Sequence, residues 1–223
     1  MSPSDEEART TVRELLADHG RTYADEAGIR LKDTPQPLYQ LLVLAHLLSA
    51  RIRAGTAVAA ARALFDAGMR DARHMKDASW QERVDALGEG GYRRYDERTS
   101  TQLGKAAELV LDEWGGDLRR LHAEAGDDPD RLRELLEEVP GIGPAGADIF
   151  LREAQAVWPR LSPYLDDRAL KGAERLGLPK DPDRLAGLVN RKELPSLAAA
   201  LVRAALDRHV VEDVRSHHQG GKG

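Results

Sequence analysis

The segment that most constrains the fold is a short run of glycines and prolines between two helix-forming stretches. Leucine and glutamate at 135–138 are followed by residues 139–144, which read Val-Pro-Gly-Ile-Gly-Pro, and then by an alanine-rich stretch. Because proline is tolerated in the first turn of a helix, Pro144 marks the start of a second helix. The two glycines permit backbone conformations that a side chain forbids. The segment therefore predicts two helices joined by a tight corner.

This arrangement is a helix-hairpin-helix motif, and its corner suits a phosphate group. Successive N–H groups can point outward together at the start of the second helix, where the helix dipole favours an anion. We therefore expect the backbone of Gly141, Ile142, Gly143 and Ala145 to bind the DNA backbone, with the Ile142 side chain packed between the two helices. A plain glycine turn between packed helices is the alternative.

Composition favours helices and excludes several kinds of site. Aromatic residues make up 4% of the 223 residues, which favours helices over sheets. The absence of cysteine excludes disulfides, thiolate catalysis and cysteine-bound zinc or iron–sulfur clusters. The acidic amino terminus is unlike a secretory signal, and the most apolar stretch, residues 38–50, is too short for a membrane span. We therefore expect a cytoplasmic protein without a membrane partner, and the sequence predicts no protein partner.

The charge is unevenly distributed along the chain. The formal net charge of −5 argues mildly against a generic nucleic-acid binder, which is usually basic. Residues 51–105, however, contain 11 basic and 8 acidic residues, and the remainder of the chain carries −8. A locally basic face on an acidic protein is therefore expected, although arginine-rich helices are often only solvated.

A second informative segment follows the corner at residues 158–178. It contains Leu165-Asp166 and ends in the run Arg-Leu-Gly-Leu at 175–178. This segment resembles the aspartate segment of the helix-hairpin-helix DNA glycosylases related to endonuclease III, in which Val-Asp begins a helix that ends in Arg-Leu-Gly-Leu. Together with the corner, the resemblance spans roughly residues 38–178. Members of this superfamily excise damaged or mispaired bases.

The resemblance implies an all-α fold of two lobes with a central cleft. Residues 37–160 would form a helical lobe that contains the hairpin, and residues 1–36 and 161–223 would form the second lobe from both ends of the chain. The pattern of apolar residues predicts helices over 5–27, 38–50, 58–65, 79–87, 127–138 and 194–214, and one that begins at Ser100 or Thr101. A connection is expected over 28–37, and disorder at the glycine-rich end, 217–223.

The resemblance also implies a catalytic role for Asp166. Breaking an N-glycosidic bond develops positive charge on the sugar, and an ionised carboxylate stabilises that charge and positions water. The start of a helix favours the ionised form. Asp167 is the competing carboxylate, and an ordinary helix cap is the alternative role for Asp166.

The sequence departs from the family pattern at the hairpin. Bifunctional relatives have a lysine two residues after the second glycine, which attacks the sugar as an amine. This chain has Ala145 there, so the resemblance implies that the Schiff base and the strand-cleaving lyase step are absent. Lys171 is the alternative amine, although helix geometry points it to a different face from Asp166. A monovalent cation that bridges the hairpin carbonyls to phosphate is known in the family, and the sequence permits it.

Other DNA contacts follow from the same resemblance. Residues 47–51, Leu-Leu-Ser-Ala-Arg, match a segment whose last residue, glutamine in relatives, helps to fill the space left by an extruded base, so Arg51 takes that position. The run at 92–95 lies where relatives place a second wedge, with Tyr92 and Arg93 as stacking and phosphate-binding residues. Lys105, with Ser100 and Thr101, lies near the next predicted helix start and is a candidate phosphate ligand. Solvated arginines and capping hydroxyls are the alternatives.

Three hypotheses for function remain open at this point. The first is a monofunctional DNA glycosylase of base excision repair that acts on double-stranded DNA. The second is a non-catalytic helix-hairpin-helix DNA-binding protein, and the third is a helical protein that never meets DNA. No histidine spacing indicates a catalytic metal, and we expect His46, on the buried stretch 38–50, to be a core residue with its hydrogen bonds satisfied.

Overall fold

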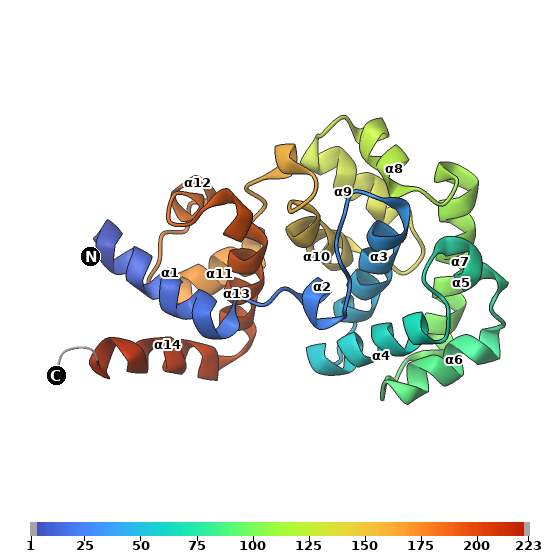
Figure 1. Ribbon diagram of the computed structural model, residues 1–223, viewed down its shortest axis with the longest axis horizontal. Helices are drawn as coiled ribbons and strands as arrows, with labels where there is room; N and C mark the ends of the chain where they lie inside the picture. The colour runs from blue at the N-terminus through green and yellow to red at the C-terminus, as the bar shows by residue number, and fades with distance from the viewer. Residues whose placement is uncertain (1–3, 221–223) are drawn as a thin grey trace. The chain divides into compact units, whose positions relative to one another are not determined.

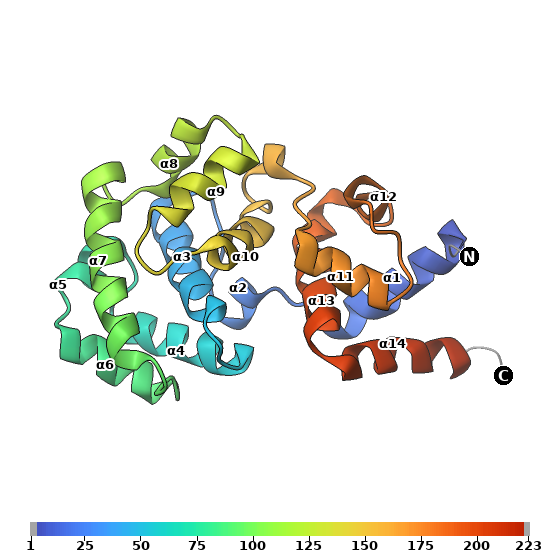
Figure 2. The ribbon, with the colours of Figure 1, turned by 180° about the vertical axis from the view of Figure 1, so that it is seen from behind.

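The structure of the protein, a computed structural model, describes residues 4–220 and is helical throughout, with no strand within that range (Figure 1). The chain divides into two compact units. Unit 1 combines both ends of the chain, residues 1–23 and 152–223, and unit 2 comprises residues 24–151. Figure 2 shows the same units from behind. The all-α expectation is confirmed.

Unit 2 is built around one helix that is buried on nearly every side. Its helices are α2 (Tyr23–Glu26), α3 (Pro35–Ser49), α4 (Ala54–Asp66), α5 (Ala72–Asp77), α6 (Trp80–Glu89), α7 (Asp96–Trp114), α8 (Leu118–Ala125), α9 (Pro129–Glu137) and α10 (Pro144–Ala154); the first residue of α2 and the last three of α10 belong to unit 1. Every residue of α3 from Leu41 to Leu47 is buried, because α4 and α8 pack against it. A helix that is apolar all round is stable only in such a position.

Unit 1 is organised around α13. Its elements are α1 (Asp5–His19), the 3-10 turn η1 (Pro159–Leu161), α11 (Asp167–Arg175), α12 (Pro182–Ala186), the 3-10 turn η2 (Arg191–Glu193), α13 (Leu194–Leu206) and α14 (Arg208–Gly220). Helices α1, α11 and α14 all pack against α13 (Figure 1). The closest approach is at Gly172 of α11, where a Cβ would lie 1.8 Å from the carbonyl oxygen of Leu201. Only glycine permits this crossing.

Several predicted helix boundaries are wrong. The prolines of 35–37, interpreted as a breaker, begin α3, since the first helical turn accepts proline. Helix α7 begins at Asp96, ahead of Ser100 and Thr101. The helix predicted over 5–27 ends at His19, before Gly20.

The carboxyl-terminal prediction is also corrected. The single helix predicted over 194–214 is two helices, which meet at Asp207 in extended conformation. Helix α14 extends to Gly220, into the segment from residue 217 that was expected to be disordered, and residues 221–223 lie outside the described part of the chain. None of the described helices combines the length and the apolar character needed to cross a membrane.

Candidate nucleic-acid interface and carboxylate site

The hairpin of unit 2 lies between α9 and α10, and its tip is exposed. Gly141 adopts φ +87°, in the left-handed region that favours glycine. The Ile142 amide donates to the Val139 carbonyl oxygen at 2.9 Å and closes the turn. The Ile142 side chain is 4% exposed, which agrees with the expected packing of this residue inside the hairpin, whereas Gly143 and Ala145 are exposed.

The amides of the hairpin differ in whether they are available to a ligand. Among the described residues, none accepts a hydrogen bond from the amides of Gly141, Gly143 or Ala145. The Ile142 amide already donates its hydrogen bond within the turn, so its expected role as a hydrogen-bond donor to phosphate is corrected. The open amides lie at and before the start of α10, where the helix dipole favours an anion.

The carbonyl side of the same turn suits a monovalent cation. The Gly143 carbonyl oxygen accepts the first hydrogen bond of α10, from Ala147 at 3.0 Å. The carbonyl oxygens of Gly141 and Ile142 accept no hydrogen bond from residues 4–220. These two oxygens would hold such an ion. No three His, Asp or Glu side chains of the described chain are grouped so that they would bind a metal ion.

His46 of α3 supports the hairpin from inside unit 2. A Cβ on Gly141 would lie 2.3 Å from His46 Cε1, so the glycine backbone rests against the imidazole ring. His46 is 5% exposed, and its Nε2 lies 3.2 Å from the Gln102 amide oxygen, to which it donates. Burial lowers the pKa of His46 to about 4, against the effect of the Gln102 hydrogen bond, and the positive charge of Arg98 lowers it further. The expected core role of His46 is confirmed.

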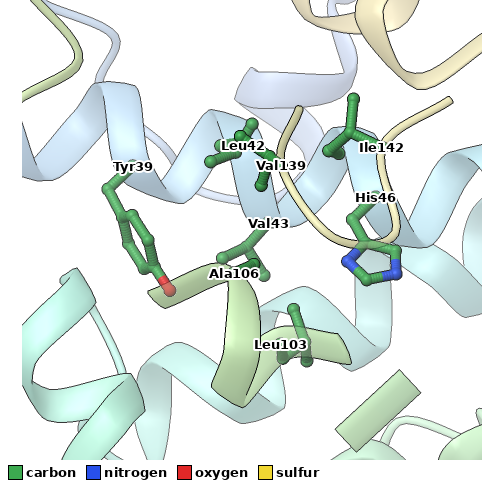
Figure 3. Close-up of a pocket in the computed structure, with 8 residues that line it drawn as sticks. All are labelled: Tyr39, Leu42, Val43, His46, Leu103, Ala106, Val139 and Ile142. Atoms are coloured by element: carbon green, nitrogen blue, oxygen red, sulfur yellow. The ribbon is translucent and has the colours of Figure 1, made fainter. Parts of the chain in front are cut away.

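A small cavity lies beside this ring. Figure 3 shows His46 and Tyr39 of α3 lining it together with Val139 and Ile142 from the hairpin. Its volume of about 10 Å³ is sufficient for roughly one water molecule. The cavity is therefore a packing feature of unit 2, too small for a nucleobase.

Three of the predicted DNA-contacting cations are exposed in unit 2. Arg51 lies two residues after Ser49, whose Cβ is 3.7 Å from the Cβ position on Gly146, so the end of α3 adjoins the hairpin. Arg93 is exposed between α6 and α7. Lys105 is exposed in the third turn of α7, which corrects its expected place at a helix start.

The other residues predicted around 92–101 lie in the core or within α7. Tyr92 is 1% exposed, its hydroxyl lies 3.2 Å from Thr99 Oγ1, and burial raises the pKa of its phenol. A side chain in this position cannot stack on a base, so the wedge role expected for Tyr92 is corrected. Ser100 is fully buried and donates to the Trp80 carbonyl oxygen at 2.8 Å, and Thr101 donates to the Glu97 carbonyl oxygen at 3.1 Å.

Asp166 of unit 1 caps α11 and forms a nearly buried ion pair. Its Oδ1 accepts from the Ala169 amide at 3.3 Å, so the capping interpretation is confirmed. Nη1 of Arg152 lies 3.1 Å from Oδ1 and 3.2 Å from Oδ2. The two side chains are 7% and 11% exposed, for Arg152 and Asp166 respectively. Asp167 and Lys171 are exposed on α11.

The loop that leads to Asp166 is fixed by the polar end of α10. Gln155 is 3% exposed; its amide nitrogen donates to the Tyr164 carbonyl oxygen at 3.0 Å, and its amide oxygen accepts from the Tyr164 amide at 2.9 Å. Sequence reasoning missed both Arg152 and Gln155. The signal that could have identified them is the polar run Arg-Glu-Ala-Gln at 152–155, because it follows directly on the apolar part of a helix.

The pairing with Arg152 limits what Asp166 can do chemically. The carboxylate is held in one orientation, and Oδ2 still has a lone pair that no described backbone group uses. A guanidinium at hydrogen-bond distance, however, partly cancels the negative field that a sugar cation would experience. The site therefore combines a well-oriented carboxylate with reduced electrostatic strength.

Known proteins resemble this chain in structure but not detectably in sequence. Models of known protein families give no match to the sequence, and neither do curated proteins. A solved non-covalent endonuclease III–DNA complex matches 90% of this chain and 85% of its own, with 16% sequence identity and a TM-score of 0.53. A trapped endonuclease III–DNA covalent intermediate, an estranged-adenine complex, has the same identity, covers 90% of this chain and 86% of its own, and has a TM-score of 0.47. Through its likeness to the non-covalent complex, the chain has the fold of endonuclease III, the all-helical fold that the hairpin and the aspartate segment led us to expect.

Proposed function

We propose that the chain is a DNA repair protein that binds double-stranded DNA through the hairpin of unit 2 and hydrolyses the N-glycosidic bond of a damaged or mispaired base. The observation that carries the proposal is the exposed hairpin, where the amides of Gly143 and Ala145 face no acceptor among the described residues. Endonuclease III is bound to DNA in the solved non-covalent complex. A DNA phosphate is the ligand that fits these donors.

The cations of unit 2 supply the remaining contacts with DNA. Arg51, two residues after the Ser49 that adjoins the hairpin, would support an extruded base. Lys105 and Arg93 are exposed and suited to phosphates elsewhere on the duplex. These contacts are independent of sequence, so they leave the choice of base to the lesion itself.

Asp166 is the proposed catalytic carboxylate. It would stabilise the sugar cation that forms as the base departs, and it would orient the water that then bonds to the anomeric carbon. Ala145 offers no amine, so no Schiff base forms at that position and the strand is not cleaved. The activity is therefore that of a monofunctional glycosylase without a lyase step.

A second candidate is a non-catalytic DNA-binding protein, which the Arg152–Asp166 ion pair favours. The pair lies at 3.1 Å and partly neutralises the carboxylate that the reaction needs. Both candidates require DNA binding, and they differ only in base release.

The test uses purified protein and duplexes that carry alkylated, oxidised, deaminated or mismatched bases. The proposal predicts abasic sites on at least one lesion, with Asp166→Asn abolishing release but not binding, and no product trapped by borohydride. Release by Asp166→Asn at the wild-type rate would remove Asp166 from the mechanism, and a strong trapped band would show that another amine, such as Lys171, acts. Binding without release on any lesion would leave the second candidate.

DNA binding itself is tested with Gly143→Asp. No atom lies within 4 Å of the Cβ position on Gly143, so this variant should fold while placing a negative charge beside the open amides. It should bind duplex DNA at least tenfold more weakly, since a charged hydrogen bond to phosphate contributes about 1.5–3 kcal/mol. Unchanged affinity would mean that the corner is only a structural turn.

A further inference from the structure

We propose that Arg98 of α7 binds a phosphate of the DNA strand that the hairpin holds. The proposal rests on the DNA-binding function above and adds to it a cation that the motif itself does not contain. The starting observation is that residues 139–147 include no lysine or arginine, while Glu137 and Glu138, just before them, are exposed acids. A full positive charge near this corner would therefore come from another element of unit 2.

A chain of contacts connects the hairpin to α7. Gly141 rests on the His46 ring, where a Cβ would lie 2.4 Å from Nε2. The same Nε2 lies 3.2 Å from the Gln102 amide oxygen. The flank of α7 that carries Gln102 is therefore directed towards the helix on which the hairpin rests.

Arg98 lies one helical turn before Gln102 on that flank. Residues four apart in a helix are neighbours on its surface. The charge of Arg98 also contributes to the low pKa of His46, which agrees with a guanidinium close to the ring beneath the hairpin. Arg98 is exposed and forms no ion pair with any residue from 4 to 216.

The chemistry of these groups is complementary. The hairpin amides donate hydrogen bonds but carry no net charge, and His46 is neutral near pH 7 because its pKa is about 4. A guanidinium supplies a full positive charge and a planar fork of donors that matches phosphate oxygens. Arg98 and the amides together would hold neighbouring phosphates of one strand, a contact that is independent of base sequence.

The experiment measures the salt dependence of binding to an undamaged duplex by fluorescence anisotropy. Loss of one phosphate contact lowers the slope of log affinity against log salt by about 1. Arg98→Ala should show this decrease and weaker binding to every sequence, and Arg98→Lys should retain most of the slope. The control is Lys180→Ala, which removes one cation of unit 1 that pairs with Glu174 at 2.8 Å. It should leave the slope unchanged.

The outcomes separate this inference from the proposed function. Wild-type protein that binds with a steep salt slope, alongside Arg98→Ala with the same slope, would overturn the role of Arg98 and leave the hairpin proposal intact. A wild-type protein with no salt-dependent binding would overturn both. An equal decrease in Lys180→Ala would show that total charge, and not the position of Arg98, determines the slope. Because the Arg98 side chain is exposed, thermal unfolding should show the same Tm for wild type and Arg98→Ala.

Discussion

The amino termini of α10 and α11 differ in whether their first amides have a hydrogen-bond acceptor within the chain. At α10 the amides of Gly143 and Ala145 have no acceptor within the described chain, and both residues are exposed. At α11 the carboxylate of Asp166 accepts from the Ala169 amide at 3.3 Å, and Arg152 then pairs with that carboxylate. The first terminus is open to an external anion, whereas the second has an anion of its own.

The difference separates the proposed DNA binding from the proposed chemistry. The proposed phosphate binding at the α10 terminus would use backbone groups that the Gly-Ile-Gly corner already positions, with Arg98 of α7 supplying the net positive charge. The proposed base release would need a side chain of unit 1, Asp166, that also caps a helix and pairs with Arg152. We therefore expect substitutions at the hairpin to change DNA affinity, and substitutions around Asp166 to change stability and catalysis together.

The largest expected effect distinguishes the two glycines of the corner. Gly141→Ala places a Cβ 2.3 Å from the His46 ring at a residue with φ +87°. Overpacking and a left-handed backbone conformation together should lower the free energy of unfolding by about 4 kcal/mol. Chemical denaturation monitored by circular dichroism measures this loss.

Gly143→Ala is the matched control, because no atom lies within 4 Å of its Cβ position and its φ is not in the left-handed region. It should change the free energy of unfolding by less than about 1 kcal/mol. Equal destabilisation by the two substitutions would contradict the view that only Gly141 is packed against His46.

The sequence predicted those features of the two helix termini that depend on residues adjacent in the chain. The corner at 139–144 and the cap at Asp166 are local patterns, in which turn and cap chemistry decide the conformation. The start of α7 was misplaced, because the hydroxyls of Ser100 and Thr101 resemble a cap, whereas Ser100 donates to Trp80 of α6 and Thr101 donates to Glu97 within α7. A hydroxyl pattern cannot show whether its partner is a helix end or a neighbouring helix.

The parts that the sequence did not predict depend on contacts between distant segments. Arg152 pairs with Asp166 across fourteen positions, and His46 meets Gln102 across fifty-six. Tyr92 was expected to stack on a base because its run lies where relatives place a second wedge, but its ring is buried and its hydroxyl lies 3.2 Å from Thr99 Oγ1. Burial of such residues follows from the way helices pack, which the position of a run along the chain does not specify.

A smaller effect is expected when the aspartate site loses its cation. Arg152→Met leaves the carboxylate of Asp166, 11% exposed, without its charged partner. Removing one member of a buried pair is strongly destabilising, and we expect a loss of about 3 kcal/mol from the free energy of unfolding. Adding Asp166→Asn to this variant should recover most of the loss, since asparagine keeps the cap and removes the unpaired charge. Additive effects in the double-mutant cycle would mean that the pair is not coupled.

The smallest of the three effects concerns pH and the support of the hairpin. The pKa of His46 is about 4 in the folded protein, below the ordinary value of 6.5, so the unfolded chain binds the proton more tightly. Stability from this residue is complete above about pH 6.5 and is lost as the pH falls towards 4, with a decrease of about 2 kcal/mol by pH 5. Urea denaturation of wild type and His46→Gln across this range measures the effect, because glutamine does not titrate. Parallel pH profiles for the two proteins would show that His46 has the same pKa in the folded and the unfolded chain, which would contradict the desolvation of its ring beneath Gly141.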